Sequence, residues 1–143
     1  MTIAECSNRY SFAMSGLQEE ILQILGDMEW QFIVWETDRL WRGINADNEM
    51  IVPEYAESTI RTKKRKSLPY DRVILYDTGM FYQSIFAKVE GNELVIDTPW
   101  ENVKYLKKKY GERILGLTEE EKSKSNVMTA DAMCVYVKQI VGL

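Results

Sequence analysis

The sequence contains no histidine and only 2 cysteines among its 143 residues. Without histidine, the chain lacks the general base of a Ser-His-Asp triad or a Cys-His pair. Cys6 and Cys134 lie near opposite ends and form no CxxC motif, whereas a structural zinc site normally needs four cysteine or histidine ligands. We therefore expect no metal site and no cofactor, and we expect each cysteine to be a small buried or half-buried side chain.

Long apolar segments are also missing. No stretch approaches the ~20 apolar residues of a membrane helix. The first ten residues, MTIAECSNRY, lack the basic start and apolar core of a signal peptide. We therefore expect no membrane partner and a protein that stays in the cytosol where it is made. The hydrophobic content of 45% and the 4 Trp, 8 Tyr and 4 Phe predict one domain with an ordinary core.

Acidic and basic residues are unevenly distributed along the chain, whose formal net charge is −4. Residues 1–60 contain eleven acidic and three basic residues, whereas residues 61–113 contain seven acidic and twelve basic residues. This separation suits a protein that binds copies of itself, or charged neighbours, through surfaces of opposite sign.

The region from Ser15 to about Arg42 is predicted to be helical, because apolar side chains recur at steps of three and four. Ser15 is the expected N-cap, with Gln18 completing a capping box. Gly26-Asp27 is an expected interruption, giving two helices or a kink, and Gly43 is the expected end.

Three of the four tryptophans, Trp30, Trp35 and Trp41, lie in this predicted helix. The helix is consequently apolar over much of its circumference. Either these side chains belong to the core, or one aromatic face meets another subunit, since interfaces are rich in tryptophan. The three tryptophans are therefore candidates for a subunit interface.

A basic run, Arg61-Thr62-Lys63-Lys64-Arg65-Lys66, lies in a segment rich in turn-forming residues. Residues 44–72 are predicted to be mainly loop, with a short helix over residues 54–60. A solvated, mobile loop is the simplest interpretation of the run. Alternatively, its side chains contact an acidic partner or the phosphate backbone of DNA. The pI near 5.0 and the lack of a recognised reader motif argue against a dedicated nucleic-acid binder.

The triplet Asp77-Thr78-Gly79 follows an apolar run, Val73–Tyr76, which is expected to be a short strand. Retroviral-type aspartic proteases present their catalytic carboxylates in such a triplet, and two of these aspartates share a proton. Here bulky residues follow the glycine, and only 34 residues separate Gly79 from the next apolar-apolar-Gly motif, which begins at Ile114. We therefore predict a turn with no catalytic role. A dimeric aspartic protease using Asp77 is the alternative.

The predicted strands Phe81–Glu90 and Glu93–Asp97 are joined by Gly91-Asn92, a strong hairpin signal. Thr98 is the expected N-cap of a helix that ends at Gly111. Thr118 opens a predicted short acidic helix, and residues 129–141 form a last helix or strand. The predicted fold class is α+β in a single domain, residues 1–143. Its parts are a helical part (1–43), a loop with the basic run (44–72), and a sheet with helices (73–143).

Three segments form an ordered series over roughly residues 38–121. They are RLWRGINADNEMIVPEYAESTI, RKSLPYDRVILYDTGMFYQSI and YLKKKYGERILGLTEEE. The second contains an L-x-x-T-G-x-L/F-x-x-S pattern, and the third contains Tyr110-Gly111 and Gly116. This layout resembles the tail-completion, or virion morphogenesis, proteins of tailed phages, in versions from phages and prophages of gut bacteria. The residues of the first pattern are Leu75, Thr78, Gly79, Phe81 and Ser84.

The resemblance implies a non-enzymatic structural subunit of a virion, assembled in the host bacterial cytoplasm. The implied partners are further copies of the chain in an oligomeric ring, and portal, connector or tail proteins. Non-specific contact with packaged DNA is a further implied interaction. The positions of tail terminator, neck ring and tail-associated protein all stay open. In such a ring, the acidic first sixty residues of one copy would meet the basic middle of the next.

Overall fold

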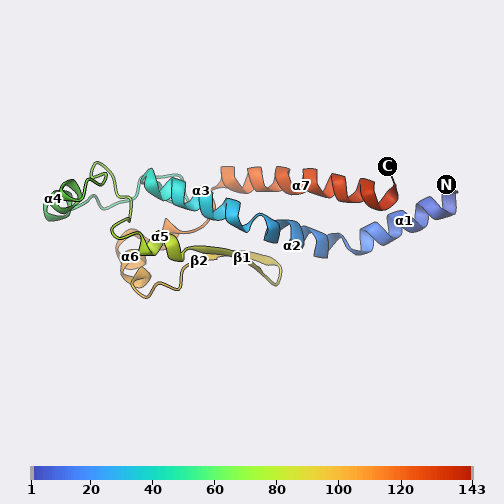
Figure 1. The fold of residues 1–143 in the computed structure, drawn as a ribbon, viewed down its shortest axis with the longest axis horizontal. Helices are drawn as coiled ribbons and strands as arrows, with labels where there is room; N and C mark the ends of the chain where they lie inside the picture. The colour runs from blue at the N-terminus through green and yellow to red at the C-terminus, as the bar shows by residue number, and fades with distance from the viewer. Residues whose placement is uncertain (1, 143) are drawn as a thin grey trace.

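The computed structural model describes residues 2–142, with the side chains of residues 3, 6, 10 and 13 left undescribed. The described chain has an α+β fold, as predicted (Figure 1). Its two-stranded antiparallel sheet is preceded and followed by helices along the chain. The elements are α1 (Ile3–Ser15), α2 (Leu17–Asp27), α3 (Glu29–Trp41), α4 (Glu57–Arg65), α5 (Met80–Ser84), β1 (Phe86–Glu90), β2 (Glu93–Asp97), α6 (Val103–Tyr110), a 3-10 turn (Glu112–Ile114) and α7 (Glu119–Val141).

The first three helices follow one another as a long, bent rod (Figure 1). The break near Gly26-Asp27 was predicted: α2 ends at Asp27 and α3 begins at Glu29. The predicted N-cap at Ser15 is wrong, because helix α1 already runs through this residue and the Ser15 hydroxyl donates to the Phe12 carbonyl at 2.7 Å. The predicted end at Gly43 is confirmed, since α3 ends at Trp41 and Gly43 follows the Arg42 C-cap with φ 74°.

Helix α7 runs antiparallel to α1 and α2 and packs along both of them (Figure 1). The predicted capping box at Thr118 is present, but the expected short acidic helix and the last element are one helix of 23 residues. Residues 129–141 are therefore helical rather than extended. Cys134, expected to be buried or half-buried, is exposed on α7, while the side chain of Cys6 lies outside the described residues.

The hairpin predicted at Gly91-Asn92 is confirmed, with Ala87 opposite Ile96 and Val89 opposite Leu94. It packs against α2 and α3 on the side away from α7 (Figure 1). Ala87 joins Met28 and Phe32 in a small core cluster between hairpin and rod. The rod is thus the middle layer between one helix and one hairpin.

A second core cluster fills the other end of the molecule, around Leu40, Val73 and Ile114. Four predictions fail in this region. Residues 73–76 are irregular rather than a strand, and the predicted strand from Phe81 begins with the short helix α5. The basic run belongs largely to α4 rather than to a loop. Helix α6 begins at Val103, because Thr98 Oγ1 accepts from Trp100 N and contacts the Ser84 hydroxyl instead of capping a helix.

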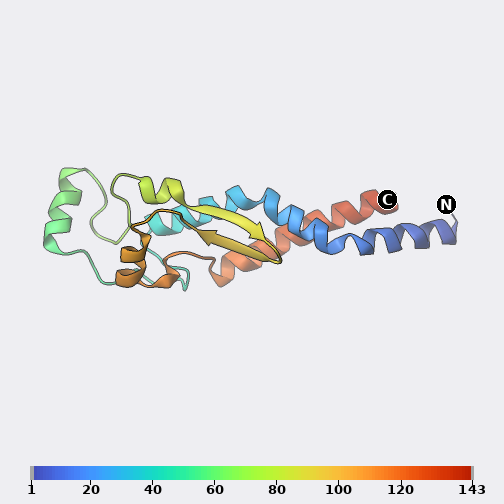
Figure 2. The same ribbon diagram turned by 90° about the horizontal axis from the view of Figure 1, so that it is seen from below.

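The molecule is elongated, with the start of α1 and the end of α7 together at one end (Figures 1 and 2). Helix α4 lies at the opposite end, beyond α5 and α6 (Figure 2). The α1, α2 and α7 helices therefore form an arm that extends from the body, and the candidate site described next lies on the α4 side.

Candidate functional site

A cleft of about 640 Å³ opens between α4, the segment before α5, and α6. Helices α4 and α6 supply two of its walls, and the Asp77-Thr78-Gly79 triplet supplies the third. Its volume lies within the range of ligand and peptide pockets, roughly 300–1,000 Å³. The lining combines aromatic, hydroxyl and charged side chains, among them Tyr55, Thr59, Thr62, Lys63, Lys66, Tyr76, Asp77, Phe81, Trp100 and Tyr110.

Lys63 is the buried cation of the cleft, with 6% of its surface exposed. Its ammonium donates to the Tyr76 carbonyl and lies 5.2 Å from the centroid of the Tyr55 ring. Burial lowers the pKa of Lys63, because removal from water disfavours the charged form. Nearby Asp77 opposes that shift and Lys66 adds to it. The described residues place no carboxylate within ion-pair distance of Lys63, so an anionic or electron-rich partner in the cleft would stabilise it.

Lys66 and Asp77 form an ion pair at the rim of the cleft, where both side chains are largely exposed. The hydrogen bond from Lys66 lowers the pKa of Asp77. A protease dyad needs the opposite arrangement, in which a neighbouring carboxylate raises the pKa of one aspartate so that the two share a proton. The surroundings of Asp77 therefore favour the turn interpretation.

Gly79 ends this triplet with φ 89° and is the N-cap residue of α5. A Cβ at this position would lie 2.9 Å from the Tyr76 hydroxyl oxygen. The positive φ agrees with the predicted turn, and the absence of a side chain also makes room for the cleft-lining Tyr76.

The wall formed by Leu75 is held in a strained conformation, with φ 54° at a buried leucine. The Tyr55 hydroxyl accepts hydrogen bonds from the amides of Ile74 and Leu75 at 3.0 and 3.2 Å. The Tyr82 hydroxyl donates to the Ile74 carbonyl at 2.6 Å. Burial raises the pKa of both tyrosines, which keeps them protonated. Two tyrosines thus fix the backbone at the base of the cleft.

The residues of the two sequence patterns do not gather at one point. Leu75, Phe81 and Tyr110 line the cleft. Ser84 contacts Thr98 through their hydroxyl oxygens at 2.6 Å, which ties α5 to the end of β2. Two glycines serve the backbone: Gly111 ends α6 with φ 93°, and Gly116 has φ 123° beside a buried ion network.

That buried network joins Glu36, Arg39 and Glu121. The Arg39 guanidinium donates to Glu36 at 2.7 Å, to Glu121 at 2.8 Å, and to the Gly116 carbonyl at 2.8 Å. Glu36 also accepts from the Gly116 amide at 3.0 Å. Burial raises the pKa of Glu36 to about 7, against the attraction of Arg39. The network connects the rod to the start of α7 and was not predicted from the sequence.

The basic run divides between two faces of α4. Lys63 and Lys66 line the cleft, whereas Arg61, Lys64 and Arg65 are exposed. Lys64 also lies 4.7 Å from the centroid of the Tyr70 ring. The run is therefore an ordered helix with one cleft-lining side and one solvent-facing side.

The three tryptophans have different surroundings. Trp35 packs against the cluster around Phe32, at 5.8 Å between ring centroids. Trp41 contacts the rings of Tyr76 and Tyr82 edge-on and keeps 37% of its surface exposed. Trp30 is 64% exposed. Of these interface candidates, Trp30 therefore offers the largest exposed surface fraction.

The cleft as a unit was not predicted from the sequence, and neither were its lining residues Tyr55, Tyr76 and Trp100. The sequence does place these aromatic residues beside the basic run and the hairpin, at turn-rich positions.

Among residues 2–142 no helix is long and apolar enough to span a membrane, and no three acidic or cysteine side chains are grouped as a metal site. Comparisons with protein-family models, curated proteins and solved structures found no match.

Proposed function

We propose that this protein is a non-enzymatic structural subunit of a phage virion that assembles as an oligomeric ring at the head–tail junction or in the tail. The resemblance of residues 38–121 to tail-completion proteins supports the proposal. The observation that carries it in the structure is the separation of charge on an elongated molecule. Surfaces of opposite sign on different parts of one subunit suit head-to-tail contacts, which close into rings.

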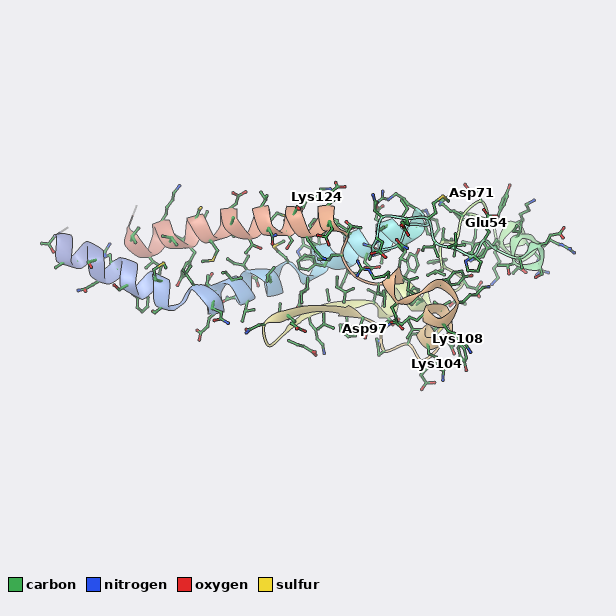
Figure 3. The ribbon with its side chains drawn as sticks, turned by 180° about the vertical axis from the view of Figure 1, so that it is seen from behind. Glu54, Asp71, Asp97, Lys104, Lys108 and Lys124 are labelled. Carbon is green, nitrogen blue, oxygen red and sulfur yellow. The ribbon has the colours of Figure 1, made fainter. Side chains whose placement is uncertain are left out.

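The acidic part is the rod, where residues 17–36 contain five acidic and no basic residues. The basic part consists of α4 and α6, which flank the cleft. Helix α6 carries four lysines and no acidic residue. Figure 3 shows two of them, Lys104 and Lys108, pointing outward from α6, on the side away from the rod. One subunit therefore offers both a negative and a positive surface to its neighbours.

The mass of the assembled species tests this proposal. Native mass spectrometry and sedimentation of the full-length protein are expected to give a closed oligomer of several subunits. Proteomic analysis of virions purified from the phage or prophage that encodes the chain is expected to detect it. A strictly monomeric protein that is absent from purified virions would contradict the proposal.

Contact with DNA is a second candidate role, favoured by the exposed face of α4. Helix α4 lies at one end of the molecule (Figure 2), and its Arg61, Lys64 and Arg65 are exposed, so phosphate groups could reach them. If they bind duplex DNA, affinity falls steeply with salt, and replacing all three with glutamine weakens binding equally for unrelated sequences. Gel-shift or anisotropy measurements at low salt would detect this, and a wild-type protein that ignores DNA there would rule it out.

A further inference from the structure

Trp30 is an unusual surface residue, because an indole that is 64% exposed keeps a large apolar area in water. Val34, one turn further along α3, is 48% exposed. Two exposed carboxylates bracket this pair along the rod: Asp27 lies one turn before Trp30, and Asp38, which also pairs with Arg42 at 3.2 Å, lies one turn after Val34. The rod thus carries an apolar knob with acidic residues on either side.

The cleft between α4 and α6 has the complementary character. Its lining includes four aromatic residues, Tyr55, Phe81, Trp100 and Tyr110, among hydroxyl and charged side chains. Lys63 inside it has no carboxylate partner at ion-pair distance among residues 2–142. The lysine-rich helices α4 and α6 flank it. A cleft of about 640 Å³ has room for an indole and part of its neighbouring side chains.

These two surfaces match in size, polarity and charge. An indole that entered the cleft would bury its apolar area against aromatic rings. The carboxylates beside it would approach two basic helices, which strengthens association and steers the approach of the partner. The electron-rich face of the indole would also stabilise the buried Lys63 ammonium.

We propose that Trp30 of one subunit inserts into the cleft between α4 and α6 of a second copy of this chain. The inference rests on the proposed ring assembly and names the two surfaces that would make it. The contact is heterologous, because each subunit presents the Trp30 surface to one neighbour and the cleft to the other. Such a contact can repeat around a ring, which an isologous dimer contact does not do.

Two single substitutions test the two surfaces of this contact one at a time. Trp30→Ala removes the knob and leaves the cleft intact. Ser58→Trp places a bulky side chain at an exposed, cleft-lining position of α4 and leaves Trp30 intact. Both positions are exposed, so both variants are expected to keep the wild-type melting temperature. Each is expected to weaken self-association roughly 30-fold or more, the loss typical of a tryptophan at the centre of an interface.

Mixing the two variants gives the sharpest measurement. The Trp30→Ala chain has an intact cleft and the Ser58→Trp chain has an intact Trp30, so an equimolar mixture has one functional pairing. Native mass spectrometry of the full-length chains is expected to show the mixed 1:1 dimer and little of either homodimer. Tyr105→Ala is the control, since Tyr105 is 62% exposed on α6 but does not line the cleft. It is expected to associate as the wild type does.

Three results would overturn the inference: a wild-type protein that stays monomeric at the highest concentration reached, Trp30→Ala chains that associate normally, or a mixture without the 1:1 dimer. The virion proposal has a separate readout. Trp30-dependent association of a protein that is absent from virions would refute the virion role alone. If the protein is present in virions but its self-association does not depend on Trp30, this contact alone is refuted.

Discussion

Gly79 adopts a backbone conformation that other residues reach only with strain. Its φ is 89°, and an added Cβ would approach the Tyr76 hydroxyl oxygen within 2.9 Å. We expect Gly79→Val to lower the free energy of unfolding by about 2 kcal/mol or more, since a left-handed conformation alone costs non-glycine residues about 1–2 kcal/mol. Chemical denaturation of the variant measures this loss.

Asp77→Asn is the matched control in the same turn. It removes an ion pair with Lys66 whose side chains are 64% and 44% exposed, and exposed pairs contribute about 0–1 kcal/mol. We therefore expect a mild effect. A large loss of unfolding free energy in Asp77→Asn, together with a small loss in Gly79→Val, would contradict the turn interpretation. It would indicate that the Asp77 carboxylate has a specific role.

The raised pKa of Glu36 predicts how the stability of the protein depends on pH. Burial raises its pKa to about 7 in the folded protein, from an ordinary value of 4.5, because removal from water disfavours the carboxylate more than the nearby Arg39 cation favours it. Between these two pH values the folded state binds the extra proton. The contribution of Glu36 is therefore full below about pH 4.5 and is lost as the pH rises through 7, by up to roughly 3 kcal/mol.

Urea denaturation at several pH values between 5 and 8 measures this effect. Glu36→Gln should flatten the decline in the free energy of unfolding, because the side chain no longer titrates. Glu119→Gln, at an exposed carboxylate of α7, should keep the wild-type profile. Identical profiles for Glu36→Gln and the wild type would show that Glu36 stays ionised in the folded protein.

At the scale of elements, two helices begin with the same capping box in different surroundings. The Thr118 hydroxyl accepts from Glu121 N at the buried start of α7, and the Thr2 hydroxyl accepts from Glu5 N at the exposed end of the arm. We expect Thr118→Ala to cost about 1 kcal/mol of global stability. Thr2→Ala should only fray the arm, because few contacts there depend on it. Thermal unfolding compares the two, and equal losses would contradict this assignment.

Elements with local signals were predicted well from the sequence. The Gly91-Asn92 turn fixes the hairpin and its register, and Thr118 and Gly111 mark a helix start and a helix end. The predictions failed where contacts with residues distant in the sequence determine the local structure. Thr98 reads as an N-cap, yet its hydroxyl contacts Ser84. The basic run was interpreted as a solvated loop, yet it lies largely in α4, where Lys63 donates to the distant Tyr76 carbonyl.

The candidate site was predicted in parts rather than as a whole. The Asp77-Thr78-Gly79 turn and the basic run were both recognised as unusual, and the structure brings them together at the Lys66–Asp77 pair. The sequence contains no signal for this meeting, since it depends on how the irregular segment before Asp77 folds back on α4. The same holds for Glu121, which joins Arg39 from a helix far along the chain.

At the scale of the whole molecule, the arm is the part that an isolated subunit stabilises least. Helix α2 has no buried residue, and α7 buries only Glu121, Ser125 and Val141. Exposed apolar side chains lie on α1, at Phe12 and Met14, and on α7, at Val135. Two helices paired along one seam leave much apolar surface in water, and assembly is the usual way to cover it.

Two forces could therefore drive self-association, and salt separates them. If the acidic rod meets the basic α4 and α6 helices, raising sodium chloride from about 0.1 M to about 1 M should weaken association. The reason is that the screening length falls from about 10 Å to about 3 Å. If the apolar arm drives association instead, high salt should leave it unchanged, and sodium sulfate should strengthen it. Sedimentation velocity across this range measures both. We expect weakening by sodium chloride, because residues 1–60 and 61–113 have opposite net charge and the cleft lies between the two most basic helices.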